Sequence, residues 1–129
     1  MKILVIDVGG THVKVLATGH RKFVEIPSGP KMTPAKMVAA VRSATEGWKF
    51  DVVSIGYPGA VVHGRPISEP HHLGSGWVGF NYKKAFRRPV KIINDAAMQA
   101  LGSYQGGRML FLGLGTGLGS ALIVDDVLE

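Results

Sequence analysis

The fold is decided by the stretch Ile3–Ala17, which reads ILVIDVGGTHVKVLA. Two apolar runs, Ile3–Val8 and Val13–Ala17, lie on either side of the small-residue segment Gly9–Thr11. Strand-like runs joined through a Gly-Gly pair predict a β-hairpin. Because glycine lets the main chain approach a ligand closely, the backbone amides of this turn are candidates for binding phosphate oxygens. A plain hairpin turn without a ligand would explain the same residues.

A second stretch of the same kind lies near the carboxyl end of the sequence. The apolar runs Met109–Leu112 and Leu118–Val124 flank the turn Leu114–Gly117. If both turns hold phosphate, a nucleotide or a polyphosphate chain sits between two structural halves. We therefore expect residues 1–112 to form one domain and residues 113–129 to be the opening hairpin of a second, otherwise missing domain.

Composition sets limits on the class of protein. The 129 residues are 46% hydrophobic, which suits a single core, and the lack of cysteine excludes disulfides, zinc–cysteine sites and thiol nucleophiles. No apolar run is long enough to span a bilayer, so we expect a cytoplasmic protein without a membrane partner. The net charge of +6 comes largely from a basic cluster, which comprises Lys83, Lys84, Arg87, Arg88 and Lys91. This cluster is either a solvated helix face or an anion-binding surface. No aromatic residues are interleaved with its basic ones, which argues against binding of nucleic acid.

The order of elements predicts an α/β fold. The expected strands are Lys2–Val8, His12–Thr18, Arg21–Ile26, Asp51–Gly56, Val90–Ile93 and Met109–Gly113. The expected helices start at Pro34, with Thr33 as the N-cap and an apolar stripe reaching Trp48, and cover Tyr82–Arg87 and Asp95–Tyr104. Three leading antiparallel strands followed by alternating helix and strand indicate a mixed sheet with helices packed on it.

Polar and small residues gather where the strands end. Asp7, Tyr57–Gly59, Asn94–Asp95 and Gly113–Thr116 all follow apolar strands, and ligands bind α/β sheets at the carboxyl ends of strands. Asp7 is a candidate for holding a metal-bound water, and Asp95 is either a helix N-cap or a carboxylate that accepts a proton from a substrate hydroxyl. Asn94 either orients that substrate or closes the turn. The adjacent His71 and His72 lack a third ligand, so we do not expect them to bind a metal.

Five motifs in order carry a family resemblance. They are Ile6–Thr11, Tyr57–Gly59, Gly76–Asn81, Ile93–Ala96 and Leu112–Gly117. Together they resemble the ROK-family sugar kinases, and most of all the polyphosphate/ATP glucokinase branch. The resemblance implies a ribonuclease-H-like domain of the actin-like ATPase and hexokinase architecture. It also implies phosphoryl transfer from ATP or inorganic polyphosphate, with Mg²⁺, to the 6-hydroxyl of a hexose such as glucose.

The resemblance also assigns roles to residues. Asp95 would be the general base, and the substrate-binding residues would be Pro58, Gly59, Asn81, Asn94 and Asp95. The first phosphate site would comprise Asp7, Gly9, Gly10 and Thr11, with Asp7 holding magnesium through water, and the second would comprise Gly115, Thr116 and Gly117. The basic cluster would favour polyphosphate, although no family motif covers it.

The sequence departs from the family in length. The family's later Glu-x-Gly-His segment and its adenosine-binding region have no counterpart here. We therefore expect about half of a catalytic unit, completed by a second-half chain or by a second copy in a homodimer. The alternative is a non-catalytic half-domain that binds sugar or phosphate and self-associates through its C-terminal hairpin.

Overall fold

The computed structural model describes residues 1–98. The strand expected at Met109–Gly113, the second glycine turn and the remainder of the helix expected to reach Tyr104 lie outside the described residues. Within residues 1–98, no helix is long and apolar enough to cross a membrane.

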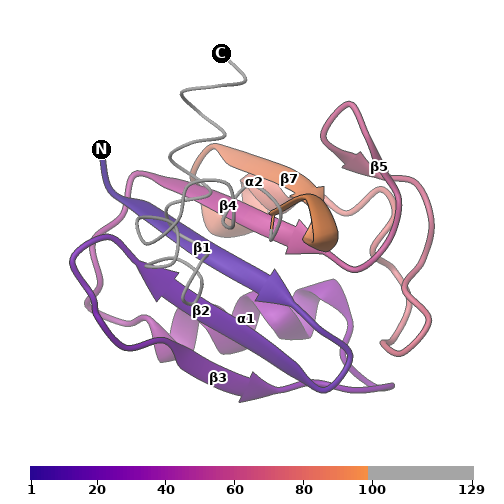
Figure 1. Ribbon diagram of the computed structural model, residues 1–129, viewed down its shortest axis with the longest axis horizontal. Helices are drawn as coiled ribbons and strands as arrows, with labels where there is room; N and C mark the ends of the chain where they lie inside the picture. Colours follow the sequence, from indigo (N-terminus) through magenta and orange to yellow (C-terminus); the bar gives the residue numbers. More distant parts are fainter. Residues whose placement is uncertain (99–129) are drawn as a thin grey trace.

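A five-stranded mixed sheet forms the centre of the described chain (Figure 1). Its strands are β1 (Ile3–Val8), β2 (His12–Ala17), β3 (Val24–Pro27), β4 (Val52–Tyr57) and β7 (Val90–Asn94), in the spatial order β3-β2-β1-β4-β7. The first three strands pair antiparallel, whereas β1 pairs with β4, and β4 with β7, in parallel. The mixed sheet expected from the sequence, with three antiparallel strands in front, is confirmed.

Two helices cover one face of this sheet (Figure 1). Helix α1 (Pro34–Ala44) has the expected cap, because Thr33 Oγ1 accepts a hydrogen bond from the Lys36 amide at 3.3 Å and proline occupies the first turn. Helix α2 (Tyr82–Phe86) is short. The core between sheet and helices is formed by alternate residues of every strand together with Met37, Val38, Val41, Tyr82 and Phe86.

Three local details differ from the sequence-based expectation. The third strand begins at Val24 rather than Arg21, because the chain first turns through Gly19, whose φ is +89°. Trp48 lies beyond the end of α1 and stacks on His20, with ring centroids 3.9 Å apart. A small hairpin, β5 (Val61–Val62) and β6 (Arg65–Pro66), occupies part of the stretch expected to be loop.

The turn of this small hairpin explains why it was missed. His63 and Gly64 have φ values of 52° and 74°, which is the left-handed pair that a two-residue type I′ turn requires. Histidine adopts this conformation less often than asparagine or aspartate, and proline in the returning strand argues against a strand. The sequence signal was therefore weak.

The second face of the sheet carries a different set of side chains. Ile3, Val5 and Leu16 are buried there, together with Ser54, whose hydroxyl has no hydrogen-bond partner among residues 1–98. Asp7 projects from the same face at the end of β1 because it alternates with the core residues Ile6 and Val8. The site described next is built on this face.

Candidate functional site

Three parallel strands end at the same edge of the sheet and bring the predicted residues together. Asp7 pairs with Gly56 across β1 and β4, and Tyr57 pairs with Asn94 across β4 and β7. The segment Pro58–Gly59 leaves β4 at the same level at which Asp95 leaves β7. This edge therefore places the first glycine turn, the Tyr-Pro-Gly segment and the Asn-Asp pair beside one another.

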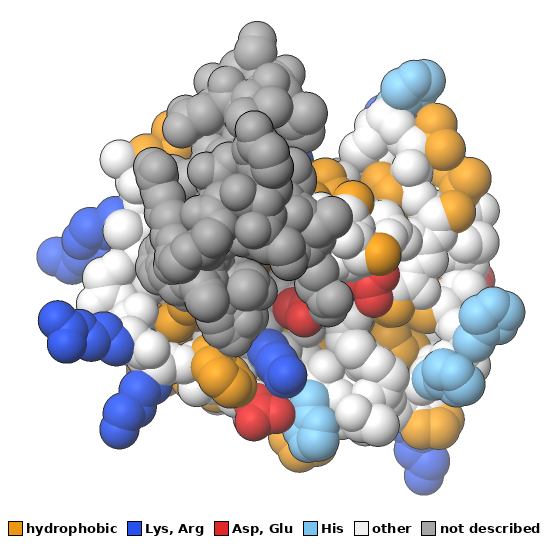
Figure 2. All heavy atoms as spheres, in the orientation of Figure 1, with side chains coloured by type: hydrophobic (Ala, Val, Ile, Leu, Met, Phe, Trp, Pro, Cys, Tyr) orange, Lys and Arg blue, Asp and Glu red, His pale blue; other side chains and the backbone are white. Residues whose placement is uncertain are grey.

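Two carboxylates, those of Asp7 and Asp95, lie close enough at this edge to interact electrostatically. Burial, reinforced by the negative charge of Asp95, raises the pKa of Asp7, and the opposing charge of Lys14 only partly offsets this. The glycine at position 56 makes room for Met98 beside Asp7, since a Cβ atom there would lie 2.9 Å from the Met98 sulfur and 3.5 Å from Asp7 Oδ1. Figure 2 shows acidic side chains near the centre of this face, with one lysine or arginine side chain directly beside them and others at its edges. The site is an acidic centre in a basic protein.

The first glycine turn is tight and tethered. The Gly9 amide donates to the His12 carbonyl at 3.0 Å, and a Cβ atom on residue 9 would lie only 2.8 Å from that oxygen. Ser28 holds the turn from the side, because its hydroxyl donates to the Gly9 carbonyl at 2.6 Å and its amide donates to the Thr11 carbonyl at 2.9 Å. Glycine is needed here for space, since neither Gly9 nor Gly10 has a positive φ.

The Tyr-Pro-Gly segment is fixed by the residues around it. Asn94 Nδ2 donates to the Gly59 carbonyl at 2.8 Å, which joins the ends of β4 and β7. A Cβ atom on Gly59 would lie 2.8 Å from the Tyr57 ring, and the Tyr57 hydroxyl donates to the Ser68 carbonyl at 2.7 Å. Burial, with a smaller contribution from the charge of Glu69, raises the pKa of Tyr57 to about 12. This tyrosine is therefore a structural hydroxyl at neutral pH.

The Asn-Asp pair begins a helical segment. Residues 95–98 are helical, and Asn94 Oδ1 accepts from the Ala96 amide at 2.9 Å, as an N-cap side chain does. Asp95 Oδ1 also accepts from the Ala96 amide, at 2.8 Å. The capping position thus belongs to Asn94 rather than Asp95, which leaves the Asp95 carboxylate half-exposed at the edge of the sheet.

Asn81 has a different setting from the other predicted substrate ligands. Its Oδ1 accepts from the Lys84 amide at 3.0 Å and so caps α2. Within residues 1–98, no hydrogen bond joins Asn81 to Asn94 or Asp95. The structure therefore shows a capping role for Asn81, and sugar binding by this residue stays a prediction.

Sequence reasoning missed Glu69, which organises the loop that leads to α2. Its carboxylate accepts from the backbone amides of Trp77 at 3.0 Å and Val78 at 2.9 Å. Desolvation raises the pKa of Glu69, but hydrogen bonds from Val78, Trp77 and Gly76 outweigh it and the net shift is downward. The signal available in the sequence was an acidic residue placed shortly before a glycine-rich turn, Gly74–Gly76, whose free amides need acceptors.

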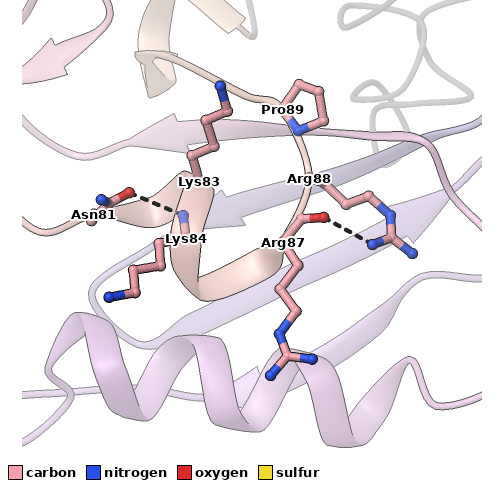
Figure 3. A pocket seen from close by; sticks show the side chains of 6 residues that line it. All are labelled: Asn81, Lys83, Lys84, Arg87, Arg88 and Pro89. Carbon is pink, nitrogen blue, oxygen red and sulfur yellow. Dashed lines mark hydrogen bonds between the residues drawn. The ribbon is translucent and has the colours of Figure 1, made fainter.

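The basic cluster lies along α2 and its carboxyl end. A groove of about 440 Å³ is lined by Asn81, Lys83, Lys84, Arg87, Arg88 and Pro89. Figure 3 shows that Lys84 and Arg87 extend on the side of α1, whereas Lys83 extends to the opposite side of α2. Within residues 1–98, neither lysine nor Arg87 forms an ion pair. Because β7 begins just after Pro89 and rises by ~3.3 Å per residue, the cluster is roughly 13 Å along the strand from Asn94.

The chemistry available at the edge is that of hard oxygen ligands and backbone donors. The described residues contain no group of three or more histidine, aspartate or glutamate side chains that could hold a metal ion by themselves. Two neighbouring carboxylates beside a glycine turn instead suit a metal shared with phosphate oxygens and water. The predicted second phosphate residues, Gly115, Thr116 and Gly117, lie outside the described part of the chain, as does the hairpin expected to self-associate.

Comparisons with known proteins agree with this geometry. The model of the ROK family matches residues 3–128. The chain is 29% identical over 133 residues to a glucokinase from Pyrobaculum calidifontis, and the match covers 98% of this chain and 45% of that protein. The chain therefore spans less than half the length of this relative.

Solved structures show the same fold. A ROK hexokinase from Thermus thermophilus superimposes with a TM-score of 0.65 at 26% identity, over 81% of this chain and 39% of the hexokinase. A ROK family protein from Streptococcus pneumoniae, solved in complex with sucrose, has a TM-score of 0.62 at 23% identity, over 80% of this chain and 37% of that protein. The mixed sheet is thus the sheet of the actin-like, ribonuclease-H-like sugar kinase domain.

Proposed function

The chain belongs to the ROK family, and from this premise we propose that it supplies the sugar-binding and catalytic half of a glucokinase-like enzyme. The reaction would be phosphoryl transfer to the 6-hydroxyl of a hexose, with glucose as the expected hexose. The observation that carries the proposal is the meeting of Asp7 and Asp95 at the ends of parallel strands, where the charge of Asp95 helps to raise the pKa of Asp7. A carboxylate with a perturbed pKa, here Asp7, beside a phosphate-type turn is typical of a functional site.

Asp95 would act as the general base. Its carboxylate accepts the proton of the sugar 6-hydroxyl while that oxygen forms a bond to the terminal phosphorus of the donor. The bond between that phosphorus and the donor's bridging oxygen breaks, and its electron pair leaves with the shortened donor. The Ala96 amide holds Asp95 Oδ1 at 2.8 Å and so orients the carboxylate.

Asn94 would contribute to the sugar site in two ways. Its side chain holds the Gly59 carbonyl through one N–H, at 2.8 Å, and fixes the Pro58–Gly59 backbone that lines the proposed sugar site. The second N–H of the same amide is available for a sugar hydroxyl. Asn81 is proposed as a further ligand, although its oxygen already caps α2.

The glycine turn would hold the donor's terminal phosphate. The proposed contacts are the backbone amides of Gly9 and Gly10 as they adjust to the ligand, the Thr11 hydroxyl and, from the second half, Gly115, Thr116 and Gly117. The neighbouring carboxylates fit Mg²⁺, which prefers oxygen ligands and keeps several waters, and Asp7 would hold the ion through water. When bound, Mg²⁺ neutralises phosphate charge.

Either ATP or inorganic polyphosphate is proposed as the donor. The basic cluster favours polyphosphate, because Lys83, Lys84 and Arg87 form no ion pair within residues 1–98 and would attract a long anionic chain. Their distance from the carboxylates excludes direct contact with the transferred group. A long chain held at its terminal phosphate by the turn would reach them, whereas ATP would not need them.

A glucose phosphorylation assay tests the proposal. The chain is assayed with ATP and with polyphosphate, alone and together with a candidate second-half chain. We expect product in at least one of these mixtures and a loss of roughly 10²–10⁴-fold in rate for Asp95→Asn. Asp51→Asn is the matched control, because Asp51 lies at the far end of the sheet, where it accepts a hydrogen bond from the Lys2 amide. The proposal would be overturned if neither donor gave product, with or without the second-half chain, or if Asp95→Asn kept full activity.

A further inference from the structure

We propose that two histidines, His12 and His72, flank the glycine turn Gly9–Thr11 and donate hydrogen bonds to the phosphate oxygens held there. This inference deepens the proposed function and rests on its assignment of phosphate to this turn. Backbone amides alone supply few donors to a terminal phosphate, and the turn itself contains no lysine or arginine. Imidazole N–H groups beside it would complete the set.

His72 lies directly against the turn although it is far away in the sequence. A Cβ atom on residue 10 would lie 3.0 Å from Cβ of His72, 3.6 Å from its Cγ and 3.7 Å from its Cδ2. The Cβ atom and the Cγ–Cδ2 edge of the His72 ring therefore lie against Gly10. Gly10 is needed because a larger residue would displace this histidine.

The loop that carries His72 is held at both ends. Leu73, the next residue, is buried, and the Gly74 amide donates to the Met32 carbonyl at 2.8 Å. On the other side of His72, Glu69 binds the amides of Trp77 and Val78. These contacts hold the backbone around His72 and so fix its position beside Gly10.

His12 occupies the other side of the turn. Its Nδ1 lies 3.3 Å from Thr11 Oγ1, and its carbonyl receives the Gly9 amide at 3.0 Å. Both histidines are exposed, so each retains a ring nitrogen for a ligand. Figure 2 shows histidine side chains on the side of the molecule towards which the arrows of β1 and β4 point in Figure 1.

The charged groups around the turn also favour an anion between the imidazoles. Lys14 lies two residues beyond His12 on β2 and is opposite Asp7 in the register of β1 and β2. Its positive charge acts on that carboxylate and lowers its pKa in part. Ser28, the neighbour of the turn on the β3 side, is neutral and already donates to Gly9. His12 and His72 are thus two exposed side-chain donors beside the turn in the part of the chain that the structure describes.

Nuclear magnetic resonance of the histidine side chains tests the inference, because the chain has five histidines and each gives its own imidazole signals. Sodium tripolyphosphate is the probe, and single histidine-to-glutamine variants assign the signals. We expect the signals of His12 and His72 to shift on titration, while those of His20, His63 and His71 stay in place. Shifts of the Gly9–Thr11 amides without shifts of His12 and His72 would overturn the inference, as would equal shifts of all five histidines.

Two further variants separate a donor from a packing residue. We expect His72→Ala to weaken tripolyphosphate binding about tenfold and His72→Gln, which keeps an N–H donor, to weaken it much less. His71→Ala, in the same loop, is the matched control and should bind normally. Equal losses of tripolyphosphate affinity for His72→Ala and His72→Gln would show that His72 only packs against the turn and donates no hydrogen bond to phosphate. The kinase proposal is judged separately, by the Asp95→Asn assay, so either idea can fail while the other stands.

Discussion

Two carboxylates of this molecule, Glu69 in a loop and Asp7 near the end of β1, have pKa values that are shifted in opposite directions. Glu69 accepts hydrogen bonds from consecutive backbone amides, and these lower its pKa. Asp7 is buried beside Asp95, and its pKa is raised. A structural carboxylate is satisfied by its own chain, whereas a carboxylate kept for a ligand remains unsatisfied until the ligand arrives. The direction of the pKa shift therefore distinguishes the loop of Glu69, which supports the site, from the sheet edge of Asp7, which would carry out the chemistry.

The largest effect on stability should come from removing Trp77, which fixes the loop that Glu69 holds. Trp77 is fully buried, its Nε1 donates to the Gly74 carbonyl at 2.8 Å, and its carbonyl receives the Tyr82 hydroxyl at 2.8 Å. Trp77→Ala should lower the free energy of unfolding by about 3–5 kcal/mol because it leaves a large cavity. Urea unfolding measures this loss. Phe23→Ala, at a ring that is 40% exposed, is the control and should cost far less.

A smaller loss is expected at Glu69 itself. Glu69→Gln replaces one acceptor oxygen by an amide group, so at least one of the Trp77 and Val78 amides loses its partner. The expected cost is about 1–3 kcal/mol, measured by urea unfolding at pH 7. Glu46→Gln, at an exposed residue after α1, is the matched control. Equal stability of the two variants would contradict the structural role assigned to Glu69.

The opposite sign is expected at Asp7. Asp7→Asn removes a charge that burial and Asp95 both disfavour, so the protein should become more stable, with a rise in Tm of roughly 1–4 °C at pH 7. The same variant should lose Mg²⁺-dependent phosphate binding. Thermal unfolding and isothermal titration with tripolyphosphate measure the two effects. A fall in Tm would show that Asp7 is a structural residue after all.

The smallest effect is the pH dependence that these two carboxylates predict. The pKa of Glu69 is lowered by folding, so its contribution to stability is complete above its ordinary value of 4.5 and is lost as pH falls through the folded value. The pKa of Asp7 is raised, so its penalty is absent below its ordinary value of 3.8 and grows as pH rises towards the folded value. Urea unfolding between pH 3.5 and 7 measures both effects. The difference in free energy of unfolding between the unaltered protein and Glu69→Gln should become smaller as the pH falls. The difference between the unaltered protein and Asp7→Asn should become larger as the pH rises.

Much of the fold was predictable because the local signals agree with each other. The Gly-Gly hairpin, the Thr33 cap with Pro34 and the apolar strand Val90–Ile93 are each defined within a few residues, and the structure has all three. The β5–β6 hairpin was missed because its turn depends on a left-handed histidine, His63.

The site was predictable only in part, for a physical reason. Asp7 and Asp95 could be placed at one edge, because strand ends in a parallel sheet meet there. The contact of His72 with Gly10 and the link from Glu69 to Trp77 depend on how one loop folds back over the sheet. Sequence spacing carries no information on such contacts.

The order of strands also sets an order of folding events. Strands β1, β2 and β3 are antiparallel neighbours in sequence, so they pair through short connections. Strands β4 and β7 join in parallel only after chain closures of several dozen residues, which are entropically slower. The edge that carries the neighbouring carboxylates is completed only when this later half docks. The hairpin with the glycine turn therefore has native-like pairing before a site exists, and substitutions in β1 and β2 should slow folding more than equally destabilising ones in β7.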